Sequence, residues 1–115
     1  MKTFQLKELR AALCFAAEGG QALHLMPEYY AHRRSDTPSC FKGRGEIAHL
    51  FDRDRARLIG KAKKLGVRVI KVERDGTDRQ HVDLCGAPLR NALAQCANDA
   101  REAEQRGLKL EDIKP

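Results

Sequence analysis

Hydrophobic and polar positions near the middle of the chain follow first a strand pattern and then a helix pattern. Residues 47–51, IAHLF, form a short apolar run of the length expected for a buried strand. Residues 53–65 repeat apolar positions at helical spacing, between an N-capping Asp52 and a left-handed stop at Gly66. The β-branched run at residues 67–72 predicts a second strand. A helix between two strands favours parallel pairing, so the pattern predicts a central β-α-β unit.

Similar patterns extend to both ends of the chain. Residues 6–18 carry an apolar stripe and predict a helix that two glycines terminate. Residues 22–26, ALHLM, predict a short strand. A last helix begins with the Gly-Ala-Pro of residues 86–88 and stops at Gly107, and residues 108–115 form a tail.

The segment before the last helix predicts another strand at residues 81–85, HVDLC. Asp75-Gly76 is a dipeptide typical of hairpin turns. A two-residue turn there would place Val69 opposite Val82, whereas a longer loop would leave HVDLC a strand without that pairing.

These elements predict one α/β domain over residues 1–115. We expect a small mixed sheet of three or four strands, with the central β-α-β unit and flanking N- and C-terminal helices. No apolar run approaches the roughly 20 residues of a membrane span, and the first ten residues lack an apolar signal core. We therefore expect a soluble, cytoplasmic protein whose four cysteines are free thiols.

Positive charge is concentrated in the central part of the chain. The formal net charge is +6, but from Lys42 to Arg74 eleven Lys or Arg stand against four acids, which gives +7. Such a patch indicates a polyanionic partner, either nucleic acid or a phosphate-bearing ligand, although a solvated helix face is the alternative. The long loop at residues 27–46 interleaves aromatic residues with Arg, as stacking on bases requires, or is an ordinary polar loop. The candidate polyanion-binding residues are Tyr30, Arg33, Arg34, Lys42, Arg44, Arg53, Arg55, Arg57, Lys61 and Lys64.

Residue types that bind metals or act as bases gather on two predicted strands. His81, Asp83 and Cys85 alternate on one strand and share a face, and His49 lies on IAHLF. Imidazole, carboxylate and thiolate are metal ligands, and a His–Asp pair can serve as a general base. His49, His81 and Asp83 are the candidate catalytic residues, with the metal and any cofactor left unassigned. In the alternative interpretation, His49 is a hydrogen-bonded core histidine, Asp83 pairs with Arg68 and Cys85 is simply buried.

The order A-H-L, a helix that closes in L-G-V, then H-V-D-L and R-x-A-L resembles a small uncharacterised bacterial family. This domain of unknown function has a His-[Leu/Met]-Ile-x-Asp motif and a later His-Tyr-Asp motif. The resemblance covers residues 47–94, and the family's motif acid falls where this chain has Arg53. The family has no established activity, so the resemblance implies only that His49, His81 and Asp83 are worth testing together. The matching positions are His49, Leu50, Leu65, Gly66, Val67, His81, Asp83, Leu84, Arg90 and Leu93.

Three functions fit these observations. The first is a binding module for a polyanion, which the basic central region favours. The second is a small hydrolase, such as a metal-dependent phosphoesterase or nuclease. Against it, this chain has few acids near its histidines, whereas two-metal phosphoryl transfer uses several carboxylates. The third is a structural or protein-binding module, for example a homodimer. Its interface would be the apolar stripe of the last helix, which consists of Leu89, Leu93, Cys96 and Ala100.

Overall fold

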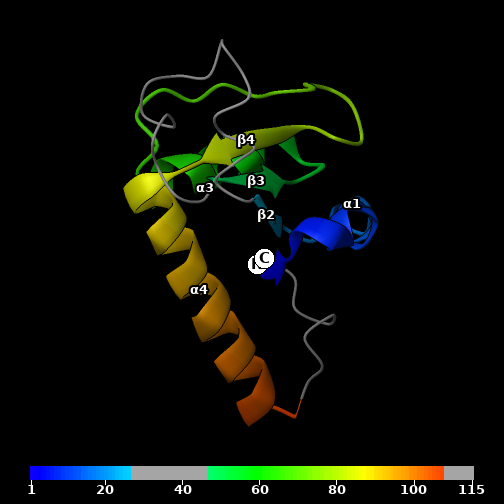
Figure 1. The fold of residues 1–115 in the computed structure, drawn as a ribbon, viewed down its shortest axis with the longest axis vertical. Helices are drawn as coiled ribbons and strands as arrows, with labels where there is room; N and C mark the ends of the chain where they lie inside the picture. The colour runs from blue at the N-terminus through cyan, green and yellow to red at the C-terminus, as the bar shows by residue number, and fades with distance from the viewer. Residues whose placement is uncertain (27–46, 108–115) are drawn as a thin grey trace.

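The computed structural model describes residues 1–26 and 47–107 (Figure 1). Within these ranges, no helix has the length and apolar composition needed to cross a membrane. Several predictions fall outside the described residues: the aromatic and basic loop, the tail, Cys40, Tyr30, Arg33, Arg34, Lys42 and Arg44.

Four strands form one mixed sheet in the order β1-β2-β3-β4. The first two strands are parallel, and the other neighbours are antiparallel. This arrangement confirms the predicted small α/β fold with flanking helices. The strands are β1 (Lys2–Phe4), β2 (Ala22–Met26), β3 (Ile47–Phe51) and β4 (His81–Leu84). The helices are η1 (Leu6–Glu8, a short 3-10 helix), α1 (Leu9–Ala17), α3 (Arg55–Leu65) and α4 (Gly86–Gln105).

The predicted central β-α-β unit is wrong. Residues 67–72 form no strand, and β3 and β4 on either side of α3 are antiparallel neighbours. Val67, Ile70 and Val72 instead pack against the core from an irregular segment, while Val69 is 87 % exposed. Among the described residues, the one parallel pair joins β1 to β2, so the β-α-β unit lies at the N-terminus and contains η1 and α1.

Of the two arrangements that the sequence left open at Asp75-Gly76, the structure has the longer loop and not the two-residue turn. Glu73 and His81 close the loop as an isolated antiparallel bridge, with N–O distances of 2.8 and 3.0 Å. Gln80 fixes its shape from inside, because its side chain accepts a hydrogen bond from Gly76 N and donates one to Asp52 O.

The ends of α3 confirm one predicted cap and correct the other. Gly66 adopts the left-handed conformation at φ 100° and ends the helix. The N-cap is Asp54, whose carboxylate accepts a hydrogen bond from Arg57 N at 3.0 Å. Asp52 is not the cap, since it is buried in a side-chain network described below.

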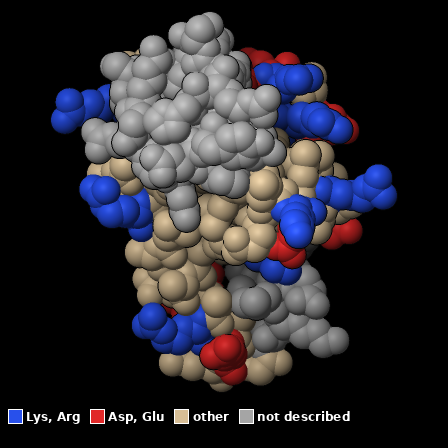
Figure 2. Space-filling model, in the orientation of Figure 1, with Lys and Arg blue, Asp and Glu red and all other residues tan. Residues whose placement is uncertain are grey.

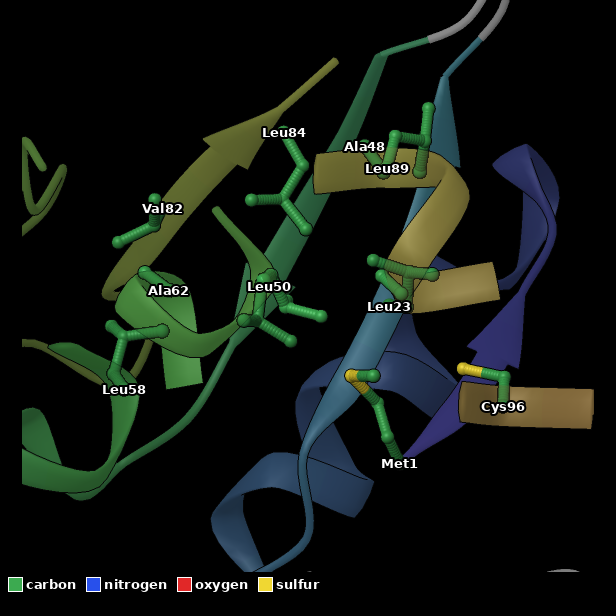
Figure 3. Packing of buried hydrophobic residues seen from close by; sticks show 12 residues of the cluster. Met1, Leu23, Ala48, Leu50, Leu58, Ala62, Val82, Leu84, Leu89 and Cys96 are labelled. Atoms are coloured by element: carbon green, nitrogen blue, oxygen red, sulfur yellow. The ribbon is translucent and has the colours of Figure 1, made fainter. Parts of the chain in front are cut away.

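The two faces of the sheet carry two separate hydrophobic clusters. On one face, strand residues such as Leu23, Leu50 and Leu84 pack against α3 and α4 (Figure 3). On the other face, Phe4 and Phe51 pack with α1 through its buried residues Ala12, Phe15 and Ala16. Side chains alternate along a strand, and residues paired across two strands share a face. The residues two positions from Phe51 on β3, and those paired with them on β4, therefore lie on the α1 face of the sheet. The candidate residues His49, His81 and Asp83 lie on this second face.

Candidate metal centre

His49, His81 and Asp83 converge on the α1 face of the sheet. One potential ligand atom from each lies within 4.8 Å of the other two. Asp83 Oδ1 is 3.5 Å from His49 Nε2 and 3.4 Å from His81 Nε2. The two imidazole ring centroids are 4.5 Å apart. The structure thus brings together the three residues that the sequence selected as catalytic candidates.

The register of β3 and β4 produces this convergence. His49 pairs with Asp83 directly across the two strands, and Phe51 pairs with His81. Because alternate residues share a face, the neighbours Leu50, Val82 and Leu84 are on the opposite face, in the core. The three polar side chains keep 22 %, 13 % and 29 % of their area exposed, in the order His49, His81, Asp83, so the cluster is accessible to solvent.

Hydrogen bonding fixes the tautomer of His81. Its Nδ1 lies 2.8 Å from the Arg79 carbonyl oxygen, which can only accept, so Nδ1–H is the donor. In the neutral ring, the lone pair is therefore on Nε2, the nitrogen that faces Asp83. A backbone carbonyl that holds the second ring nitrogen is the usual outer partner of a metal-binding histidine.

The pKa of His81 lies above its ordinary value of 6.5. Burial opposes the charged imidazolium, but the hydrogen bond to Asp83, the Arg79 carbonyl and the charges of Asp83 and Glu73 together outweigh it. The cluster therefore attracts a cation to Nε2, and a proton and a metal ion would compete for this atom.

Aromatic rings surround the cluster. The Phe51 ring lies 5.2 Å from that of His81 and 5.6 Å from that of His49, between centroids. His24 on β2 stands beside His49 at 5.8 Å and was not selected from the sequence. It is 2 % exposed, and its Nε2 donates to the Leu6 carbonyl at 3.0 Å, which leaves the lone pair on Nδ1. The position of His24 at the centre of the predicted strand ALHLM was the one indication of its role in the sequence. Its pairing with His49 depends on the β2–β3 register, which the sequence does not predict.

The structure also decides between the alternative interpretations of Asp83 and Cys85. Arg68 does not pair with Asp83 across strands, because residues 67–72 are not a strand. Cys85 is buried and is the N-cap residue of α4, and it does not belong to the three-residue group. Cys85, like Cys14 and Cys96, forms no disulfide within the described part of the chain.

The predicted basic residues of the β3–α3 region mostly have partners within the chain. Arg53 donates to the Ala17 carbonyl, Arg55 contacts both carboxylate oxygens of Asp75, and Lys61 donates to Gln95. On the face shown in Figure 2, Lys and Arg side chains are distributed over several parts of the surface, and some have acids beside them.

No family model, curated protein or solved structure matches this chain. The resemblance noted from the sequence is therefore neither supported nor contradicted.

Proposed function

We propose that the chain binds a divalent transition metal through His49, His81 and Asp83 and uses the ion to activate water for hydrolysis. One observation carries the proposal: the convergence of three ligand atoms within 4.8 Å. Tetrahedral ligands that each lie about 2.0 to 2.1 Å from zinc are about 3.3 Å from one another. The two N–O distances in the cluster, 3.4 and 3.5 Å, are close to this separation.

The number of ligands favours a catalytic site over a structural one. Structural zinc sites have four protein ligands, whereas catalytic sites have three and keep a position open for water or substrate. The group found among the described residues contains two histidines and one carboxylate. A metal ion in such a site lowers the pKa of bound water to about 7, so that hydroxide is available at neutral pH.

The chain's own residues have distinct roles in this proposal. Asp83 supplies the negative charge that partly offsets the ion, and the Arg79 carbonyl holds the His81 ring with Nε2 toward the centre. Phe51 forms an apolar wall beside both imidazoles, which lowers the local dielectric constant on that side of the site and so strengthens its electrostatic interactions.

The other two predicted functions stay predictions. In the predicted dimer stripe of α4, Leu89 and Cys96 are buried against the chain's own sheet. A dimer would therefore need a different surface.

Metal titration of the purified, untagged protein tests the proposal. After chelation, zinc or cobalt should bind in one equivalent, and cobalt should give the intense visible absorption of a tetrahedral site. Asp83→Asn and His49→Gln should each reduce the affinity at least about tenfold, because each removes a ligand. Asp78→Asn is the matched control, since Asp78 is exposed and outside the cluster.

Activity assays separate metal binding from hydrolysis. The zinc-loaded protein should cleave activated esters or phosphate esters, and Asp83→Asn should lose both zinc and activity. Stoichiometric binding without hydrolysis would reject the enzymatic part of the proposal. No binding, or equal binding by all the variants, would reject the metal site itself.

A further inference from the structure

A hollow of about 300 Å³ lies beside α3, away from the histidine cluster. Three residues of one face of α3 line it together with the glycine of the same helix, and Gln21, just before β2, completes the wall. No acidic residue is among the described lining residues. The lining residues are Gln21, Arg57, Gly60, Lys61 and Lys64.

The positive charge of the hollow follows from helical spacing. Arg57, Lys61 and Lys64 are four and three residues apart, so they lie on one face of α3. The buried Asp52 offsets Arg57 through an ion pair with an N–O distance of 2.6 Å. The two lysines therefore leave the hollow with an excess of about two positive charges.

The arginine is also held in a fixed position. Its hydrogen bonds to Asp52 and to the Gly19 carbonyl use Nε and Nη2. Nη1 is the remaining guanidinium nitrogen and is the one suited to a ligand. A planar guanidinium held by its own network loses little freedom when it binds an oxyanion.

Gln21 adds an independent indication of a ligand. The residue is 0 % exposed, and its Nε2 donates to Asp52 Oδ2 at 2.9 Å. Its Oε1 is buried and accepts no hydrogen bond from any described residue. A buried acceptor without a donor is unfavourable, so a ligand hydroxyl that reached this oxygen would stabilise it.

We propose that the hollow binds a small phosphate monoester that carries a hydroxyl group near the phosphate. Such a phosphate has a charge of about −1.5 to −2 at neutral pH, which matches the excess from the lysines. The volume is near the lower end, about 300 Å³, of known small-molecule sites. The site shares no residue with the histidine cluster, so the proposal does not rest on the proposed metal-dependent hydrolysis.

Calorimetric titration of the full chain with ribose 5-phosphate tests this site. Lys64→Gln removes a lining cation and should weaken binding by about tenfold or more, since hydrogen bonds to charged groups are the stronger kind. Lys63→Gln is the matched control, because Lys63 is the exposed neighbour on the same helix turn and does not line the hollow. Binding by Lys63→Gln should equal that of the wild type.

Gly60 offers a second test that does not remove a lysine. A Cβ atom built at Gly60 meets no atom within 4 Å, so a side chain fits there without disturbing the fold. Gly60→Asp should abolish binding by placing a carboxylate among the cations. Gly60→Asn has the same shape without the charge and should bind more tightly than Gly60→Asp.

Three ligands distinguish the sources of the phosphate. Ribose without phosphate should not bind, and inorganic phosphate should bind more weakly than ribose 5-phosphate because it lacks the attached hydroxyls. A short single-stranded DNA offers phosphodiesters with one charge each and should bind more weakly still. Tighter binding of DNA, equal losses in Lys63→Gln and Lys64→Gln, or no binding of ribose 5-phosphate to the wild type would each overturn the proposal.

Discussion

Arg57 holds the buried carboxylate of Asp52 with two hydrogen bonds. Arg57 Nε lies 2.7 Å from Oδ2, and Nη2 lies 2.6 Å from Oδ1. Gln21 Nε2 and the backbone N–H of Asp54 also donate to this carboxylate. The hydrogen bond to Asp52 raises the pKa of Arg57 against the opposing effect of burial. Since Arg57 Nη2 reaches the Gly19 carbonyl as well, one side chain joins the end of α1 to the junction between β3 and α3.

Replacement of Arg57 by Gln should therefore destabilise the fold. The substitution would leave Asp52, whose side chain is 0 % exposed, as a buried charge without its main partner. Loss of one member of a buried pair costs about 3 to 5 kcal/mol. Arg57 is about a third exposed, which reduces the expected loss to about 2 to 3 kcal/mol in the free energy of unfolding. Urea denaturation at neutral pH measures this loss.

Arg55→Gln provides the control on the same helix. Arg55 also contacts both oxygens of an acid, Asp75, but their side chains are 57 % and 47 % exposed. A pair screened by water contributes about 0 to 1 kcal/mol. If the two variants lost equal stability, the network around Asp52 would not be a structural anchor.

The same region shows where the sequence pattern stops being informative. Asp52 and Asp54 both precede α3, and either carboxylate could cap it. Which of them is buried depends on Gln21, which is 31 residues away in the sequence. Local pattern therefore predicted the helix and its Gly66 stop but selected the wrong cap.

The strands were likewise predicted only as far as local sequence patterns allow. The runs at β2, β3 and β4 were recognised from their residues, whereas residues 67–72 were not a strand despite their β-branched composition. Most of the apolar side chains of residues 67–72 are partly buried against the core, although the segment forms no strand hydrogen bonds. On α1, the structure buries Ala12, Phe15 and Ala16 and leaves Leu9 36 % exposed.

The sequence predicted the residue types of the candidate site, but it predicted only part of the site's geometry. His81 and Asp83 share a face through simple alternation, which needs no tertiary information. The position of His49 opposite Asp83 needs the β3–β4 register, and the neighbouring His24 needs the β2–β3 register as well. Register depends on contacts between distant segments, so no local pattern could supply it.

Two glycines of α3 should respond in opposite directions to replacement by alanine. Gly66 has φ 100°, where a Cβ atom is strained, so Gly66→Ala should lower the free energy of unfolding by about 1 kcal/mol. Gly60 lies in the helix interior with open space around it, so Gly60→Ala should raise stability by up to about 1 kcal/mol. Thermal unfolding of both variants measures the two shifts, and equal signs would contradict the assigned helix end.

A pair of apolar truncations tests the corrected sheet. Leu50 is 0 % exposed in the cluster beneath β3, and Leu50→Ala should cost about 2 to 5 kcal/mol through lost contacts and a cavity. Val69 is 87 % exposed, so Val69→Ala should change stability by less than about 0.5 kcal/mol. A large loss from Val69→Ala would mean that residues 67–72 are a strand after all, as the sequence pattern suggested.

The pH dependence of the metal-free protein should report the interaction of His81 with Asp83. The pKa of His81 is raised above 6.5 in the folded state, because hydrogen bonds and nearby acids outweigh burial. A raised pKa stabilises the fold below the unfolded value of about 6.5, and this contribution disappears as the pH rises through the folded pKa. Asp83→Asn removes the main attraction, so wild type and variant should differ most near about pH 5.5, where carboxylates remain ionised and histidine is protonated.

Urea denaturation in the presence of a chelator, at acidic and at mildly alkaline pH, measures this difference. The excess stability of the wild type over Asp83→Asn should shrink as the pH increases. With saturating zinc the trend should reverse, because deprotonation frees His81 Nε2 for the ion and metal binding then stabilises the folded state. A difference that stays constant with pH in the chelated protein would show that Asp83 does not hold the proton on His81. A zinc effect that weakens with rising pH up to about 8 would show that Nε2 is not a ligand.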